Sequence, residues 1–255
     1  MHVPRPVTWF ALRKLRPNLI TARGMTQSFD GFAADYDRFA SLSKPAHMSW
    51  LVDSLAEYAR RAVDLGCGSG RFTVVLAERF DQVIGVDISE PLIAIARLRR
   101  SRPNIEYRVQ DLRSFHDAEG FDLIFSSTTL HHVPDLPAAL THVRGLLKPH
   151  GRIVLIDNVA PRPTVARWRH IAGAVQRFPD DVLRLGRRDA AWLLKFQISG
   201  PWLDHLASDR FLNRKEFERI YDSVFPGGRF VRLGYLHALL WQDSRANTVA
   251  GIGEA

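Results

Sequence analysis

The chain has 255 residues, of which 46% are hydrophobic and 24% charged, so it can bury a sizeable core and is neither disordered nor collagen-like. Its single cysteine, Cys67, excludes an internal disulfide and any site built on several thiolates. A formal charge of +8 could favour nucleic acid, but the basic residues are nearly all arginines that are spread along the chain. The tightest cluster, within 97–102, is expected to end a helix and to face solvent.

The sequence also indicates where the protein resides. No stretch approaches the roughly 18 apolar residues of a membrane-spanning helix, and Met1 to Leu19 lacks the apolar region of a signal peptide. We therefore expect a cytoplasmic protein that does not enter the membrane. The sequence leaves open whether it is a monomer or a homodimer.

The predicted elements begin with an N-terminal helical cap at residues 1–60. Phe29, Phe32, Tyr36 and Phe39 recur on one side of a probable helix, and the range 48–58 resembles a second helix. These helices are expected to close over a pocket.

The range 61–160 alternates between strand-like and helix-like runs, which is typical of a parallel sheet. Expected strands lie at Ala62–Leu65, Val83–Val86, Ile105–Val109, Phe121–Phe125 and Ile153–Ile156. Ser89 is expected to cap a helix that carries Pro91 in its first turn.

The remainder is predicted to hold an insertion followed by the end of the sheet. Residues 161–211 are helix-like, rich in Trp and Arg, and interrupted by Pro179, Gly186 and Gly200-Pro201, so we expect a helical lid inserted after the fifth strand. A last helix and two final strands are expected within 212–245, and a tail at 246–255.

The most informative segment is the run from Ala62 to Gly70, in which glycines at 66, 68 and 70 follow a strand and open a helix. Glycine lets a backbone turn sharply and lets a ligand approach it closely. The dinucleotide fingerprint needs a further glycine where this chain has Arg71, and a phosphate-binding P-loop needs a lysine that is absent here. A nicotinamide enzyme and a phosphoryl transferase are both disfavoured.

Two acidic residues are expected beside this loop. Asp87 ends the second strand, where a carboxylate can bind both hydroxyls of a ribose, and Asp111 follows the third strand. In an open parallel sheet, ligands bind at the carboxyl ends of the strands. The pattern therefore implies a nucleoside with a free ribose.

These residues resemble the class I S-adenosylmethionine-dependent methyltransferases. Their first motif matches 63–70, their strand-end acids match Asp87 and Asp111, and their strand-helix-strand tail matches 146–156. The segments Phe121-Asp-Leu-Ile and His131-His-Val-Pro-Asp135 resemble the small-molecule group that includes quinone-ring methyltransferases. One departure is His150, where the family usually has glycine.

The resemblance implies an α/β fold, a Rossmann-like seven-stranded sheet with helices on both faces, and S-adenosylmethionine (SAM) as cofactor with S-adenosylhomocysteine (SAH) as product. The cofactor-binding residues that it implies are Tyr36, Asp64, Gly66, Cys67, Gly68, Gly70, Asp87, Ile88, Asp111, Leu112, Ser126 and Ser127. Asp64, Asp87 and Asp111 also have plainer interpretations, as a loop brace, a turn residue and a helix cap.

The acceptor is expected to be small and aromatic or hydrophobic, methylated on O, N or C, in quinone-type or specialised metabolite biosynthesis. His131 and His132 follow the fourth strand and are candidates for a general base. The lid residues Trp168, Trp202, His205 and Asp209 are candidates for binding the acceptor. No metal-ligand cluster is expected.

Two alternatives remain open at this point. One is an RNA or protein methyltransferase, although Ser126-Ser-Thr-Thr129 stands where enzymes that methylate base amines carry an Asn- or Asp-Pro-Pro-aromatic motif. The other is a cyclase or binding protein on the same scaffold, because fold does not fix function.

Overall fold

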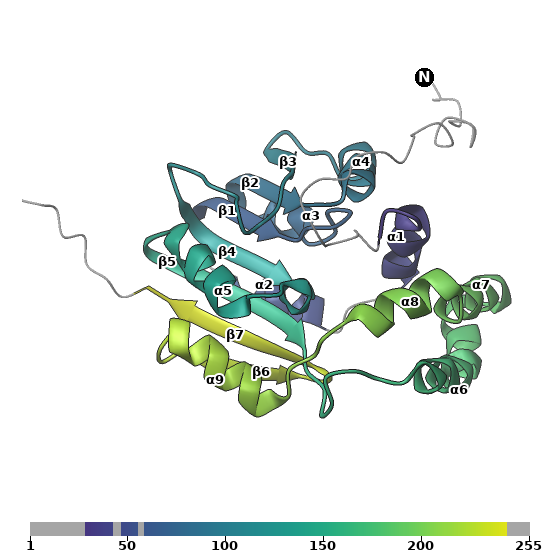
Figure 1. The fold of residues 1–255 in the computed structure, drawn as a ribbon. Coiled ribbons are helices and arrows are strands. Elements are labelled where there is room, and N and C mark those ends of the chain that lie inside the picture. Colours follow the sequence, from purple (N-terminus) through teal and green to yellow (C-terminus); the bar gives the residue numbers. More distant parts are fainter. Residues whose placement is uncertain (1–28, 43–46, 56–58, 244–255) are drawn as a thin grey trace, which may run out of the picture.

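The computed structural model describes residues 29–42, 47–55 and 59–243 of the chain. One sheet has the strand order β3-β2-β1-β4-β5-β7-β6 (Figure 1). Its strands are β1 (Ala59–Leu65), β2 (Phe80–Asp87), β3 (Ile105–Val109), β4 (Phe121–Ser127), β5 (Leu147–Asn158), β6 (Arg229–Leu233) and β7 (Leu236–Gln242). The first five strands are parallel, and β7 runs antiparallel to both β5 and β6. This confirms the predicted Rossmann-like methyltransferase sheet.

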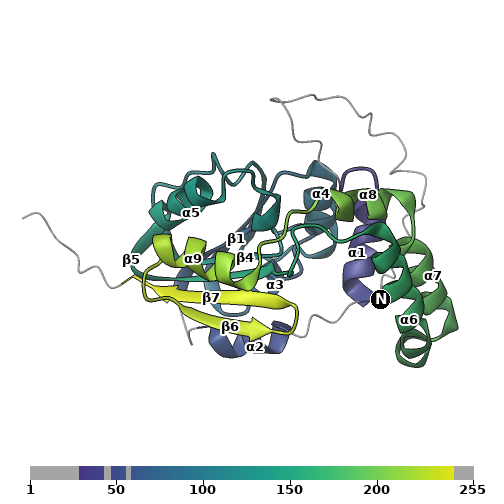
Figure 2. The same cartoon turned by 60° about the horizontal axis from the view of Figure 1, so that its bottom comes forward.

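Helices cover both faces of the sheet, as predicted (Figures 1 and 2). They are α1 (Ala33–Leu42), α2 (His47–Ser54), α3 (Thr73–Leu76), α4 (Glu90–Arg99), α5 (Leu136–Gly145), α6 (Arg167–Leu185), α7 (Arg187–Gln197), α8 (Gly200–Ser208) and α9 (Arg214–Val224), with the short 3-10 helix η2 (Leu130–His132). Helices α5 and α9 pack on one face, and α2 and α3 on the other. Some predicted parts lie outside the described residues: positions 1–28 of the cap, Tyr58 at the end of its second helix, and the tail at 246–255.

Strand β4 shows how the sheet divides the core. Successive side chains of a strand point to opposite faces, so Ile124 joins the cluster under α5 and α9, while Leu123 and Phe125 join the cluster under α2 and α3. Because both faces of a central parallel strand are covered, the strand is a continuous apolar run rather than an alternating one. Its polar end, Ser126 and Ser127, marks the edge where the site forms.

Capping residues fix where helices start at the carboxyl edge of the sheet. The Ser89 side chain accepts a hydrogen bond from the Leu92 backbone N–H, as predicted for the start of α4. Asp135 caps α5 in the same way through the Ala138 N–H. Both caps therefore hold their helices directly beside the loops that end β2 and β4.

Helices α6, α7 and α8 follow β5 in the chain and gather with α1 beyond the carboxyl ends of the parallel strands (Figure 1). Gly186, with φ of 81°, separates α6 from α7, but Pro179 lies inside α6 without interrupting it. A proline inside a helix removes one backbone donor and crowds the preceding turn, which can kink a helix without ending it, whereas Gly186 with its positive φ leaves the helical path. Of the three predicted interruptions, the one at Pro179 was therefore wrong.

The arginine cluster at the end of α4 differs from the expected solvated helix end. Arg99 and Arg100 both form ion pairs with Asp37 of α1, at 2.5 and 2.7 Å, and the Asp37 side chain is only 1% exposed. A buried carboxylate needs such partners. The cluster therefore attaches α1 to α4 at the side of the site.

Within the described ranges, no helix is long and apolar enough to cross a membrane.

Candidate cofactor and acceptor site

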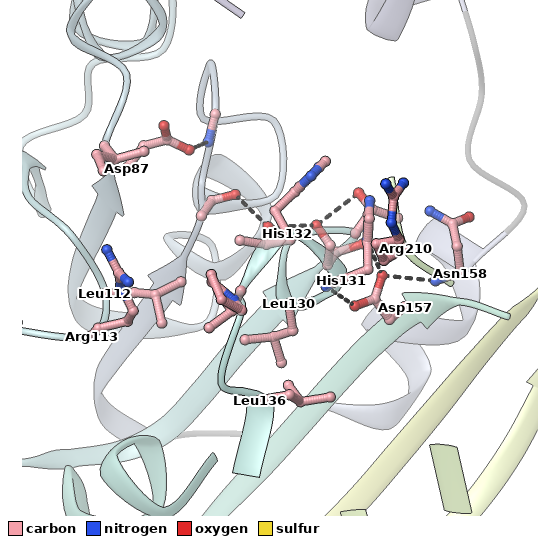
Figure 3. Close-up of a pocket in the computed structure, with 18 of the residues that line it drawn as sticks. Asp87, Leu112, Arg113, Leu130, His131, His132, Leu136, Asp157, Asn158 and Arg210 are labelled. Atoms are coloured by element: carbon pink, nitrogen blue, oxygen red, sulfur yellow. Dashed lines mark hydrogen bonds and ion pairs between the residues drawn. The ribbon is translucent and has the colours of Figure 1, made fainter. Parts of the chain in front are cut away.

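A cavity of about 760 Å³ opens at the carboxyl ends of β1, β2, β4 and β5. Ten of the predicted site residues line it: Tyr36, Gly66, Gly68, Asp87, Ile88, Asp111, Leu112, Ser127, His131 and His132. Figure 3 shows Asp87, Leu112 and Arg113 toward one end and His131, Asp157 and Arg210 toward the other. The cavity thus has an acidic end and a histidine end.

The glycine loop presents bare backbone to the acidic end. Gly66 has φ of 74°, and a Cβ there would collide with the Thr129 side chain, so only glycine fits this close approach. Gly68 has φ of 53°, lines the cavity, and would hold its Cβ in open space. A ligand can therefore lie directly against the backbone at Gly68.

The Asp87 carboxylate is positioned by backbone donors. The N–H of Gly68 donates to Oδ2 and the N–H of Ser89 donates to Oδ1, each at 2.8 Å. Burial raises the pKa of Asp87, against the effect of these hydrogen bonds and of one from the Ile88 backbone. A carboxylate offers about four lone-pair sites, so the group can also accept a hydrogen bond from a ribose hydroxyl.

Asp111 is held by an arginine that the sequence analysis missed. Burial alone would raise the pKa of Asp111, but hydrogen bonds from the Arg113 side chain and backbone lower it. Arg113 also lines the cavity, beside the apolar side chains of Ile88 and Leu112. The two apolar side chains and the carboxylate can together enclose a flat polar ring.

Four predicted cofactor residues lie behind the cavity wall: Asp64, Cys67, Gly70 and Ser126 are not among its lining residues. Asp64 accepts a hydrogen bond from the Thr73 hydroxyl at 2.6 Å, and burial raises its pKa to about 7. Burial also raises the pKa of the Cys67 thiol well above its ordinary value, so the thiol stays protonated. The Ser126 hydroxyl donates to the Leu65 carbonyl at 2.7 Å. Three of these side chains thus brace the loop from behind, while Gly70 allows close packing of Tyr107.

At the other end, His131 is oriented by Asp157, which ends β5. The ring Nδ1 lies 2.5 Å from Asp157 Oδ1, and the His131 backbone N–H donates to Oδ2 at 2.8 Å. Burial works against the charged imidazole, but the Asp157 carboxylate outweighs it, so the pKa of His131 is raised. Asp157 was missed, although it ends a strand at the same edge as Asp87 and could have been found by the same rule.

His132 has a different environment from its neighbour. Burial, with the nearby imidazoles of His131 and His205, lowers the pKa of His132 to about 2. Burial also lowers the pKa of His205 to about 4. Both imidazoles are therefore neutral near neutral pH, whereas His131 is the more basic of the predicted pair.

The four predicted acceptor residues do not line the cavity, and they divide into two kinds. Trp168 lies on α6 with 64% of its surface exposed. Trp202 packs in an aromatic cluster between α1, α7 and α8, with ring centroids of Phe32, Phe39, Phe196 and His205 at 5.0 to 6.3 Å. By contrast, His205 and Asp209 both lie next to His132. The ring centroids of His205 and His132 are 5.3 Å apart, and Asp209 Oδ1 is 3.5 Å from His132 Nδ1.

The structure differs from the expectation that no metal-ligand cluster would form. Ligand atoms of His131, His132 and Asp209 lie within 4.8 Å of one another. The sequence spacing hides this group because Asp209 follows the histidines by more than seventy residues and returns through the helical insertion.

The residues of the acidic end fit SAM. The wall provides bare backbone at Gly68, a carboxylate that can accept a further hydrogen bond at Asp87, and a second carboxylate beside two apolar side chains at Asp111. The cavity is also within the several-hundred-Å³ range that is typical of cofactor sites. Its donor set therefore matches an adenosyl group with an attached amino acid.

Comparison with known proteins agrees with this site. A family model described as a methyltransferase domain matches residues 63–155. A ubiquinone biosynthesis O-methyltransferase of Coxiella burnetii is 31% identical over 185 residues, which cover 69% of this chain and 77% of that protein. A SAM-dependent methyltransferase from Thermotoga maritima has a similar fold, with a TM-score of 0.58 and 19% identity, covering 86% of this chain and 100% of that one. The structure of DhpI in complex with SAH is also similar, with a TM-score of 0.55 and 21% identity, covering 85% and 91%.

The sheet order, the cavity at its carboxyl edge and the identity to a curated relative lead to one conclusion. The chain belongs to the class I S-adenosylmethionine-dependent methyltransferases.

Proposed function

We propose that this enzyme transfers a methyl group from SAM to a small aromatic or hydrophobic acceptor that binds at the histidine end of the cavity. The observation that carries the proposal is that His131 shares one cavity with Asp87 and Asp111. Between the two ends the wall is mostly apolar, formed by Leu130, Val133, Leu136, Leu212, Phe217 and Ile220. Such a wall suits a flat or hydrophobic molecule. The name of the Coxiella relative, which refers to a quinone and to O-methylation, supports this class of acceptor.

When bound, SAM supplies an electrophilic methyl group on a sulfonium. The contribution of the chain is mainly alignment, which can lower a barrier by roughly 7 to 11 kcal/mol in the most favourable cases. Asp87, Asp111 and the backbone of Gly68 hold the cofactor. The apolar wall holds the acceptor and excludes water.

His131 is the residue that we propose to accept a proton from a hydroxyl or amine acceptor. Asp157 binds Nδ1, which leaves the Nε2 lone pair available for the proton. The raised pKa of His131 favours this role, whereas the pKa of His132, lowered to about 2, makes it a weak base. Asp157 is then a positioning residue that sets the tautomer and orientation of the ring.

The test combines an acceptor panel with matched variants. Purified enzyme is incubated with SAM and a set of catechols, hydroxyquinols, phenols and aryl amines, and the products are identified by mass spectrometry. For an acceptor that must lose a proton, His131→Ala is expected to lower kcat by about 10²- to 10⁴-fold while leaving SAH affinity within a few fold. His116→Ala, which removes an exposed histidine outside the cavity, is the control.

Two results would contradict the proposal. If no member of the panel is methylated by protein that binds SAH in calorimetry, the acceptor class is wrong. If a double variant with His131→Ala and His132→Ala keeps wild-type turnover, neither histidine is a base. Retention of the protein on RNA at elevated salt would instead favour a nucleic-acid substrate, because nonspecific phosphate contacts weaken steeply with salt.

A further inference from the structure

Three imidazoles surround one carboxylate oxygen behind the histidine end of the cavity. The distances from Asp209 Oδ1 are 3.5 Å to His132 Nδ1, 3.9 Å to His131 Nε2 and 4.0 Å to His205 Nε2. His131 and His132 come from η2, His205 comes from α8, and Asp209 directly follows α8. The cluster thus joins the core of the fold to the inserted helices.

The Asp209 carboxylate is not satisfied by its surroundings. Asp209 is 3% exposed, and its Oδ1 has no hydrogen-bond partner in the part of the chain that the structure describes. The three imidazole nitrogens lie at or beyond the long limit of a hydrogen bond, which is about 3.2 Å for an N–H donor. Burying a carboxylate without a partner is costly, so a buried oxygen that faces three nitrogens calls for a cation between them.

The groups that meet here are ones that bind metal ions in proteins. An imidazole ligates an ion through a ring-nitrogen lone pair, and a carboxylate does so through an oxygen. Ligand atoms of His131, His132 and Asp209 all lie within 4.8 Å of one another, so one ion between them could contact all three.

The geometry is close to that of a transition-metal site. Bonds of about 2.0 to 2.1 Å in a tetrahedral site place neighbouring ligand atoms roughly 3.3 Å apart. The separations in the structure are longer, at 3.5 Å and 3.9 Å from Asp209 Oδ1 to His132 Nδ1 and His131 Nε2 and within 4.8 Å for the three ligand atoms together, so the side chains would rotate toward a bound ion. In addition, the hydrogen bond from Asp157 to Nδ1 leaves Nε2 of His131 facing Asp209, an arrangement typical of the second shell of a metal-bound histidine.

We propose that His131 Nε2, His132 Nδ1 and Asp209 Oδ1 bind one divalent transition-metal ion, with Zn²⁺, Fe²⁺ and Co²⁺ as the matching class, and leave one coordination position open. Nitrogen donors with one carboxylate suit these ions better than Mg²⁺ or Ca²⁺, which prefer oxygen. Because His131 and His132 line the cavity, the ion would lie at its histidine end.

The proposed function then gains a more specific acceptor, and this step rests on that function. An oxygen of a phenol or catechol would take the open coordination position, where the ion would lower the pKa of the hydroxyl so that its proton leaves to water. The resulting phenolate oxygen would form the new bond to the methyl carbon as the methyl–sulfur bond of SAM breaks, and SAH would leave with the electron pair of that bond. Nε2 of His131 cannot both ligate the ion and accept this proton. In metal-loaded enzyme the ion therefore replaces His131 as the activating group, and hydroxylated acceptors are favoured over amines.

The test measures metal binding directly. Full-length protein without an affinity tag is freed of metal with a chelator and titrated with Co²⁺, and bound metal is counted by elemental analysis after dialysis. We expect one ion per chain, visible d–d bands typical of low-coordinate Co²⁺, and displacement of the bands by Zn²⁺. Asp209→Asn and His132→Ala are each expected to weaken Co²⁺ binding at least tenfold, and Asp157→Asn by about 10- to 100-fold.

Controls separate this site from others. His116→Ala removes an exposed histidine whose ring packs against His142, so it tests for adventitious binding there, and it should leave Co²⁺ affinity unchanged. SAH affinity and thermal unfolding of each variant establish that it is folded. The proposal is overturned if the folded wild type retains no ion, or if Asp209→Asn and His132→Ala bind Co²⁺ as tightly as the wild type. Failure of methyl transfer in protein that binds one ion would count against the proposed function alone.

Discussion

Replacing Asp87 tests how the chain holds the ribose of its cofactor. In the folded protein, the backbone N–H groups of Gly68 and Ser89 donate to the two carboxylate oxygens, and we propose that these oxygens also accept hydrogen bonds from the ribose hydroxyls. A hydrogen bond to a charged group contributes about 1.5 to 3 kcal/mol. Asp87→Ala removes two such bonds to the ligand, so we expect a loss of at least about 3 kcal/mol, or roughly 100-fold in the Kd for SAH.

Calorimetry with SAH measures the effect, and thermal unfolding without ligand reports on the loop itself. Asp87→Asn is expected to be intermediate, because its amide oxygen can still accept one of the two backbone N–H groups. Glu90→Gln removes the same charge from an exposed position nearby and should leave SAH affinity unchanged. If Asp87→Ala binds SAH within about twofold of the wild type, the carboxylate only braces the loop and our assignment is refuted.

Three further predictions concern stability. The pKa of buried Asp64 is about 7 in the folded protein and near 3.8 in the unfolded chain, so the folded state holds an extra proton between these pH values. The free energy of unfolding, measured by urea denaturation, should therefore fall relative to that of Asp64→Asn by up to about 4 kcal/mol as the pH rises from 4 to 7. Parallel pH profiles of the two proteins would contradict this. Gly66→Ala should cost about 1 to 3 kcal/mol and weaken SAH binding, because the new methyl group collides with Thr129; an unchanged melting temperature would show that Thr129 moves aside at no cost. His150→Gly should stabilise by about 0.5 to 1 kcal/mol, because His150 has φ of 64°; a lower melting temperature would show that its side chain contributes more than this backbone strain costs.

The parts of the fold that were predictable from sequence are those encoded locally. The strands of the core appear as apolar runs, and the start of α4 is marked by Ser89 followed by Pro91. Asp87 and Asp111 were placed near one another by topology alone, because parallel strands bring their carboxyl ends to one edge.

What escaped prediction depends on contacts between distant segments. Nothing near Arg99 or Arg100 indicates that both pair with Asp37, more than sixty residues earlier in the chain. Likewise, His205 and Asp209 were predicted to contact the acceptor, and only the path of α8 places them behind His132. Local periodicity carries no information about such pairings, because they are set by how the inserted helices dock on the core.

The two ends of the cavity therefore depend on different parts of the chain. The acidic end is built by the loops after β1, β2 and β3, each fixed by hydrogen bonds within the core, as at Asp87. The histidine end is complete only when α8 brings His205 and Asp209 up to η2, and α8 is held there by aromatic packing of Trp202 and Phe32 rather than by the sheet. We therefore expect changes in the insertion to alter the chemistry at the acceptor more than the hold on the cofactor at Asp87, because the backbone N–H groups that donate to Asp87 belong to Gly68 and Ser89 of the core.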